Sequence, residues 1–197
     1  MCGAVVGWID SEGAFDPASM AAAGVDLARL LWVSVRNGTD SRRFQRHALT
    51  PFARRRSILL KAGELMLDAG GFGLVVIDFG DLRYPLPKGA ALRLGRATER
   101  SGTAVIALAS QRMCGTFAAL SLAVNRAGAS FSRIEVAAPA IFDGLRLEAT
   151  VSRNKFGGSY ASAMVDAMAD PVGQIAVPLA SAAKSRPTAM VHHGGRN

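Results

Sequence analysis

The chain has 197 residues, half of them apolar, so its length and composition predict one folded domain with a buried core. Lysine and arginine together number 23 against 15 aspartates and glutamates, which gives a net charge of +8. This balance excludes an acidic disordered segment and favours anionic partners. Cys2 and Cys114 belong to no CxxC pair, so the sequence predicts neither a disulfide scaffold nor a zinc site, and it favours the reducing cytoplasm.

The apolar opening from Met1 to Ile9 has no basic leader and meets Asp10 after only nine residues. It is too short to cross a membrane and lacks the features of a signal peptide. We therefore expect a buried strand here, and no membrane partner.

A strand, a short helix and a second strand are predicted for the first part of the chain. The strands are the β-rich apolar runs Ala4–Ile9 and Leu30–Val35. Between them, Asp16 can cap a helix, Pro17 suits its first turn, and Gly24 can end it in a left-handed conformation.

A longer helix is predicted from Thr50 and Pro51, as cap and first turn, to Gly70. Arg54 and Lys61 point away from its apolar face. That apolar face, spaced at the helical period, is formed by Phe52, Leu59, Ala62, Met66 and Ala69.

The strand, helix, strand pattern then recurs, which predicts an α/β fold. Phe72–Ile77 is a continuous apolar run followed by Asp78, typical of a parallel strand buried on both faces. A helix is predicted over Pro87–Ser101 and another strand over Thr103–Ala109.

Two further strands are predicted over Ala118–Val124 and Leu145–Ser152, where the sheet is expected to turn antiparallel. From residue 157 the chain is rich in Ala, Ser, Gly and Pro and has few large apolar residues. We therefore predict one domain over residues 1–156 and a loosely ordered C-terminal segment over residues 157–197, with little to bury in Ala183–Asn197.

Carboxylates follow two of the predicted parallel strands, where open α/β folds place their ligands. Asp78 follows the apolar run LVVI, a pattern that holds Mg²⁺ in nucleotide hydrolases. Glu12 follows GWID, where a carboxylate can orient an attacking water. A strand-end carboxylate that only caps the next turn is the structural alternative.

The string WIDSEGAFDPASMAAAGVDLARLL resembles the RecA recombinase family. GFGLVVIDFGDL is similar to that family's Walker B strand, TAVIALASQRM to its strand ending in a nucleotide-sensing glutamine, and LEATVSRNKFG to its late V-x-x-NK segment. The resemblance covers residues 4–156 and implies a RecA-like, mostly parallel sheet flanked by helices.

The resemblance also implies roles for individual residues. Glu12 matches the family's catalytic glutamate, Asp78 its Walker B metal ligand, and Gln111 its nucleotide sensor. Arg153 and Lys155 match basic residues that reach the ATP of a neighbouring subunit. These are expectations from the family pattern.

The chain departs from that pattern because it has no GxxxxGK[ST] motif, so the Walker A strand and loop that cradle phosphates are missing. Two explanations remain open: an N-truncated version of a longer protein, or a partner subunit that covers the open sheet edge. No cofactor is predicted for the chain as given; ATP and Mg²⁺ are expected only with a phosphate loop encoded upstream.

The phrases AGVDLARLLWV and AGGFGLVVIDFGDL, together with short loops after Asp78 and Gln111, resemble the ImuA branch of RecA-related proteins. That resemblance implies an adaptor in bacterial translesion mutagenesis, located in the cytoplasm with the nucleoid. Its implied partners are RecA and an ImuB-like Y-family polymerase homologue.

Positive charge is concentrated between Arg36 and Lys61, where eight basic residues and one acid supply +7 of the net charge. A solvated helix face in an arginine-rich protein is one interpretation. The other is non-specific, salt-sensitive binding of DNA or an acidic partner. The candidate residues are Arg42, Arg43, Arg46, Arg54, Arg55, Arg56 and Lys61.

The sequence thus favours an adaptor of the DNA-damage response without robust ATP hydrolysis. One alternative is a DNA-dependent RecA-type ATPase that uses Glu12 as base, Asp78 through Mg²⁺ and Gln111 as sensor. A second alternative is a gene remnant that folds poorly.

Overall fold

A computed structural model of the chain describes residues 4–35, 50–82, 84–133, 139–157, 161–169 and 175–176. The chain divides into two compact units. The first comprises Met1–Ser121 with Ser152–Gly158, and the second comprises Leu122–Val151 with Ser159–Asn197. The predicted tail Ala183–Asn197 lies outside the described residues.

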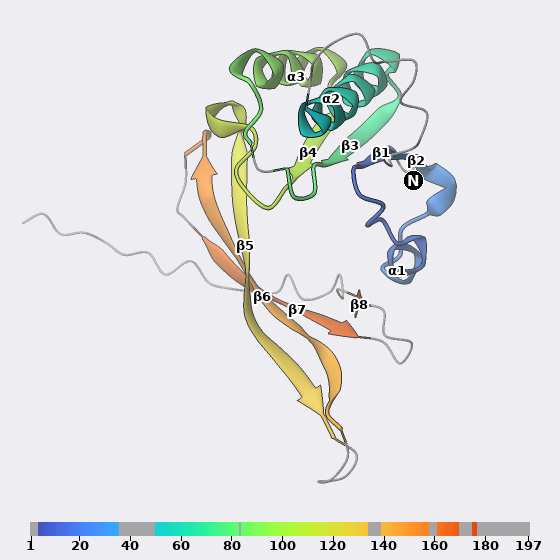
Figure 1. Cartoon of the computed structure of the whole chain (residues 1–197), viewed down its shortest axis with the longest axis vertical. Coiled ribbons are helices and arrows are strands. Elements are labelled where there is room, and N and C mark those ends of the chain that lie inside the picture. The colour runs from blue at the N-terminus through green and yellow to red at the C-terminus, as the bar shows by residue number, and fades with distance from the viewer. Residues whose placement is uncertain are drawn as a thin grey trace, which may run out of the picture. The chain divides into compact units, whose positions relative to one another are not determined.

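The first unit contains a four-stranded parallel sheet in the order β2-β1-β3-β4. Its helices connect these strands along the chain (Figure 1). Its elements are β1 (Val5–Asp10), α1 (Pro17–Ala22), the 3-10 turn η1 (Leu27–Arg29), β2 (Leu30–Ser34), α2 (Pro51–Ala69), β3 (Phe72–Asp78), α3 (Lys88–Ser101), β4 (Ala104–Leu108) and the 3-10 turn η3 (Gly115–Phe117).

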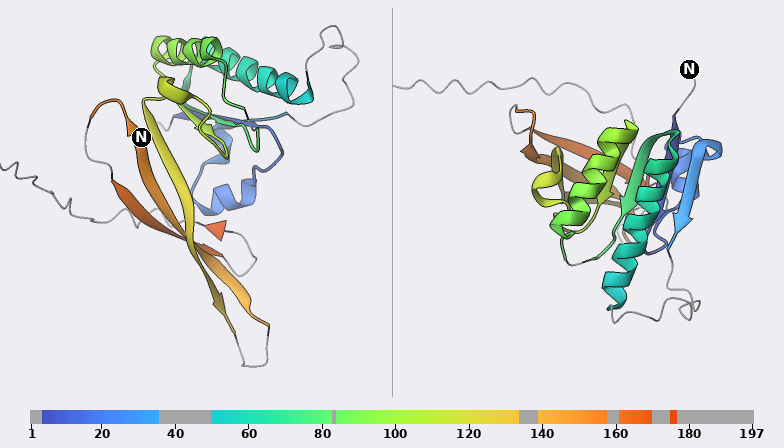
Figure 2. Two further views of the ribbon diagram at one scale, coloured as in Figure 1. Left: turned by 60° about the vertical axis from the view of Figure 1, so that its left-hand side comes forward. Right: turned by 90° about the horizontal axis from the view of Figure 1, so that it is seen from above.

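Helices α2 and α3 lie side by side on one face of this sheet (Figures 1 and 2). In register across the strands, Ile9, Ile77 and Ala107 point toward the helices. They pack there with the buried helix residues Leu59 and Leu94, among others. The apolar runs that predicted the strands therefore form the core, as expected for a parallel sheet.

The helix boundaries follow the capping residues. The Asp16 carboxylate accepts hydrogen bonds from the backbone N–H groups at the start of α1, with Pro17 as its first residue. The Thr50 hydroxyl caps α2 by accepting from Ala53 N at 3.3 Å. Gly70, at φ +71°, ends α2 in a conformation that glycine adopts without strain.

The predicted apolar face of α2 is buried in its middle part. Leu59 and Met66 belong to the core, whereas Phe52 in the first turn is 58% exposed. The buried cluster starts only at Leu59, two turns further along. At Gly63 the helix approaches the sheet so closely that a Cβ would lie 2.8 Å from the Cδ1 atom of Ile77.

On the opposite face of the sheet, the loop after β1 is anchored by an aromatic cluster. Phe15 is buried and lies between Trp8 of β1 and Trp32 of β2, with ring centroids 5.2 and 5.1 Å apart. These tilted aromatic contacts fix the path of the chain from β1 into α1.

The second unit is built on an antiparallel sheet in the order β5-β6-β7-β8. The two long strands lie where the sequence predicts strands, but they extend further. The strands are β5 (Leu120–Ser132), β6 (Ile141–Asn154), β7 (Ser162–Ala169) and β8 (Ile175–Ala176).

Strand β7 lies within the segment for which we predicted loose order. Its inward positions are small or short residues, and Val165 pairs with Leu147 and Ala167 with Leu145 of β6. Ala and Val side chains bury little surface, so the strand depends on its pairing with β6.

The fold class is thus α/β, with a parallel sheet flanked by helices and an antiparallel sheet. Among the residues that the structure describes, none of the helices combines the length and apolar character needed to cross a lipid bilayer.

Candidate functional site

The candidate site lies at the carboxyl ends of β1 and β3. These strands are parallel, and Asp10 at the end of β1 is in register with Asp78 at the end of β3. Because parallel strands end at the same edge of the sheet, the turn that carries Glu12 and the turn after Asp78 are neighbours. The structure therefore brings together the two carboxylates that the sequence singled out.

Asp10 organises the turn that carries Glu12. Its side chain is fully buried, and its Oδ1 accepts hydrogen bonds from the backbone N–H groups of Glu12, Gly13 and Ala14 at 3.0, 2.7 and 3.2 Å. Its Oδ2 accepts from Phe15 N at 3.0 Å. Burial acts to raise the pKa of Asp10, but the four N–H donors together hold it below its usual value.

The Glu12 carboxylate forms an ion pair with an arginine of α2. Its Oε1 lies 3.4 Å from Nη1 of Arg55, whose side chain is mostly buried. Gly80, in the turn after β3, packs against Glu12 and against the hydroxyl of Ser11. The Ser11 hydroxyl is buried and has no hydrogen-bond partner among the described residues.

Asp78 is partly buried, and its Oδ1 accepts a hydrogen bond from Gly80 N at 2.8 Å. Burial raises the pKa of the Asp78 carboxyl. The hydrogen bond from Gly80 opposes this shift, and the negative charges of Asp10 and Glu12 add to it. The site therefore contains one carboxylate that favours its charged form and one that resists it.

Gln111 lies beyond the end of β4, at the same edge of the sheet, and its side-chain amide is engaged by the protein. Its Nε2 donates to the backbone carbonyl of Leu82 at 3.2 Å. Leu86 N also donates to Met113 O at 2.9 Å, so two bonds tie the loops after β3 and β4 together. The predicted sensor residue thus holds one loop against the other.

Arg153 and Lys155 lie at and just beyond the end of β6. The Nζ of Lys155 donates to the carbonyl of Phe117 at 3.2 Å, while Nε of Arg153 is buried without a partner among the described residues. Among the described contacts, none joins either residue to Glu12, Asp78 or Gln111.

The predicted basic cluster is described only in part. Arg42, Arg43 and Arg46 lie outside the described residues. On α2, Arg55 pairs with Glu12, and Arg56 donates from Nη1 to the carbonyl of Pro85 at 3.3 Å. Arg54 and Lys61, on the outward side of α2, have no ion-pair partner within the described part of the chain.

The described carboxylates at this edge do not form a metal site by themselves. Within the described ranges, no three His, Cys, Asp or Glu side chains are placed to hold a metal. Asp10 already accepts four N–H donors, and Glu12 is paired with Arg55.

A separate open depression lies toward the other ends of β1 and β2 and is lined by Val5, Asp26, Ala28, Arg29, Leu30 and Leu31.

Sequence reasoning missed the role of Asp10, which we interpreted only as the end of a strand. The signal was the string Asp10-Ser11-Glu12-Gly13, because an Asp followed by a Gly with positive φ is typical of a turn closed by the carboxylate.

No family model matches the chain, and no curated protein matches it either.

Proposed function

We propose that the chain is a RecA-like accessory protein of the ImuA type. In this proposal it is an adaptor in the bacterial DNA-damage response, at translesion mutagenesis. It acts in the cytoplasm at the nucleoid, through contacts with RecA and with an ImuB-like Y-family polymerase homologue, and without robust ATP hydrolysis. DNA contacts through the predicted basic residues ahead of α2, Arg42, Arg43 and Arg46, would be non-specific.

The observation that carries this proposal is the ion pair between Glu12 and Arg55. A general base must reach a water molecule with a free carboxylate oxygen. Here Oε1 of Glu12 is paired with a guanidinium, and the side-chain amide of Gln111 donates to the backbone carbonyl of Leu82. Both positions thus serve contacts within the protein, as expected for a scaffold that presents surfaces.

The second candidate is a RecA-type ATPase, and one observation favours it. Glu12 and Asp78 are close enough for the charge of Glu12 to raise the pKa of Asp78, at the sheet edge where α/β folds bind ligands. Because the described carboxylate oxygen of Glu12 is paired with Arg55, we assign no hydrolytic step to these residues.

The test is binding of the purified full chain to RecA and to the Y-family homologue from the same genome, measured by isothermal titration calorimetry. The adaptor proposal predicts micromolar or tighter binding to at least one of them, with the same affinity in the presence and absence of ATP. A Y-family polymerase from a distant bacterium is the control. No binding to either cognate protein would contradict the proposal.

A further inference from the structure

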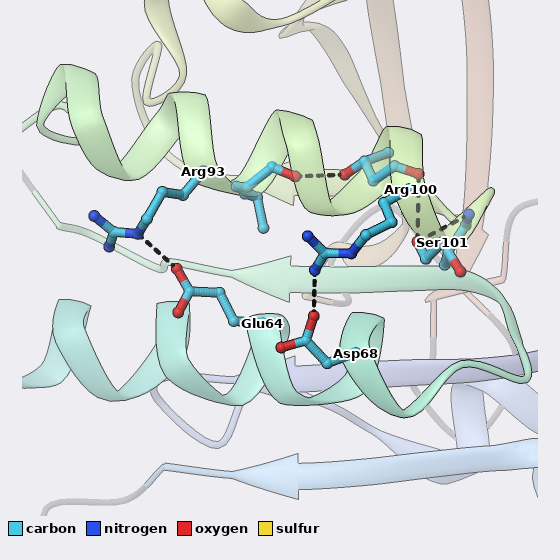
Figure 3. Close-up of polar contacts among 8 residues, drawn as sticks. Glu64, Asp68, Arg93, Arg100 and Ser101 are labelled. Carbon is cyan, nitrogen blue, oxygen red and sulfur yellow. Dashed lines mark hydrogen bonds and ion pairs between the residues drawn. The ribbon is translucent and has the colours of Figure 1, made fainter.

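The outward layer of the first unit is formed by α2 and α3, which are joined by two ion pairs. Arg93 Nε lies 3.1 Å from Oε1 of Glu64, and Arg100 pairs with Asp68 (Figure 3). The carboxylates that α2 presents toward α3 are therefore already neutralised.

A mixed basic and aliphatic stripe runs along the outer side of α2, and we call Arg54, Ile58, Lys61 and Leu65 the α2 ridge. Their spacing of i, i+4, i+7 and i+11 places them on one side of the helix, opposite the buried Leu59 and its neighbours. Ile58 is 45% exposed and Leu65 is 56% exposed. Each aliphatic side chain thus has a cation one turn before it.

Within the described part of the chain, the two cations of the α2 ridge have no ion-pair partner. Neither Arg54 nor Lys61 pairs with a carboxylate in the part of the chain that the structure describes, whereas Arg55 pairs with Glu12. Their aliphatic stems can extend the apolar contact offered by Ile58 and Leu65 while the charged ends reach a flanking anion.

We propose that the α2 ridge docks an amphipathic helix of a partner protein, whose aliphatic residues are flanked by Asp or Glu. Such a helix would bury Ile58 and Leu65 and pair its carboxylates with Arg54 and Lys61. The two cations are seven residues apart, about 10.5 Å along the axis, so acids two turns apart on the partner match them. This inference rests on the proposed adaptor function and names the surface that carries it.

Charge complementarity alone would also admit DNA, but the aliphatic residues favour a protein. Binding to a DNA duplex is strengthened by cations that reach the phosphates. An aliphatic side chain placed against the charged backbone adds nothing to that affinity. On the α2 ridge two of the four residues are exposed aliphatics. A helix with an apolar stripe and acidic flanks satisfies all four positions.

The test uses the full chain and the cognate Y-family homologue, with affinities from calorimetry. Two variants change the ridge: Ile58→Gln with Leu65→Gln, which keeps helix propensity and charge, and Arg54→Glu with Lys61→Glu. Matched controls on α3 are Leu92→Gln and the pair Lys88→Glu with Arg96→Glu, which change the same charge on exposed positions. Each ridge variant should weaken binding by at least about tenfold, and each control by less than about twofold.

Wild-type affinity in both ridge variants would overturn the docking surface and leave the adaptor function standing. The same titrations with a short DNA duplex provide the competing outcome. If Arg54→Glu with Lys61→Glu weakens DNA binding more than the α3 control does, while Ile58→Gln with Leu65→Gln leaves partner binding unchanged, the ridge is a polyanion surface and the proposal is wrong.

If the wild-type chain binds neither cognate protein, the proposed function fails, and photo-crosslinking then decides the docking surface. Benzoylphenylalanine replaces Leu65, or Leu92 as control, in the organism that encodes the chain, and adducts are identified by mass spectrometry. An adduct within an acidic amphipathic helix at position 65, absent at position 92, supports the docking surface. No adduct, or equal adducts at both positions, overturns it.

Discussion

Arg55 and Glu12 are 43 residues apart in sequence, yet Nη1 of Arg55 lies 3.4 Å from Oε1 of Glu12. The contact joins the first turns of α2 to the loop after β1. It lies beside Asp78, which the charge of Glu12 makes harder to ionise. One ion pair therefore links the outer helix layer to the candidate site.

A double-mutant cycle with Arg55→Gln and Glu12→Gln should give a coupling energy of about 0.5 to 1 kcal/mol, because the Glu12 side chain is partly exposed. The measurement is the free energy of unfolding in urea. The matched cycle with Arg54→Gln and Glu12→Gln should show no coupling, since Arg54 has no described ion pair. Equal coupling in the two cycles would mean that the contact does not form in solution.

Asp10→Asn should destabilise the chain by at least about 2 kcal/mol, because the buried carboxylate accepts four backbone N–H groups. Because the pKa of Asp10 is lowered in the folded state, its ionised carboxylate stabilises the fold at any pH above the usual carboxyl pKa. That stability is lost as the pH falls through the lowered pKa of the folded state. The cost of Asp10→Asn should therefore shrink in acid. Asp16→Asn, at the exposed cap of α1, should cost less than about 0.5 kcal/mol in the same urea titrations, because Asn caps as well as Asp.

Asp78→Asn should have the opposite pH dependence. The folded state raises the pKa of Asp78 above its usual value of 3.8. The protonated side chain therefore stabilises the fold below pH 3.8, and this stability is lost as the pH rises through the raised pKa. The variant should therefore gain stability relative to wild type on going from about pH 3 to about pH 7. Unfolding free energies at several pH values provide the measurement, and a relative loss over that range would contradict the raised pKa.

Gly80→Ala should be destabilising by at least about 1 kcal/mol more than Gly102→Ala. Both glycines have positive φ, at +55° and +67°, so the backbone strain is similar. A Cβ on Gly80 would lie 2.6 Å from Cδ of Glu12 and 2.8 Å from the hydroxyl of Ser11, whereas a Cβ on Gly102 would have no atom of the described residues within 4 Å. Thermal unfolding of the two variants compares them directly, and equal costs would show that Glu12 and Ser11 do not hold fixed positions against Gly80.

Much of the first unit could be predicted from the sequence because its signals are local. Thr50 and Gly70 fix the ends of α2, and the apolar run before Asp78 defines β3. The parallel pairing also follows, since alternating strands and helices permit few other arrangements. Phe52 was misplaced because periodicity gives the face of a helix but not where along its length the sheet begins.

The contacts of the candidate site could not be predicted in the same way. The sequence selected Glu12 and Asp78 as strand-end carboxylates, and the register brings them to one edge. That Arg55 rather than Arg54 reaches Glu12 depends on how α2 rotates over the sheet. The partner of Gln111 is a backbone carbonyl, which leaves no trace in the residue type of Leu82.

The most direct test of the central claim is steady-state ATP hydrolysis by the purified full chain with Mg²⁺ and single-stranded DNA. Wild type, Glu12→Gln and Asp78→Asn are compared at equal concentration. If these carboxylates serve contacts within the protein, all three should hydrolyse ATP at the same background rate. DNA-stimulated hydrolysis by the wild type that both substitutions abolish would contradict the account and establish the ATPase.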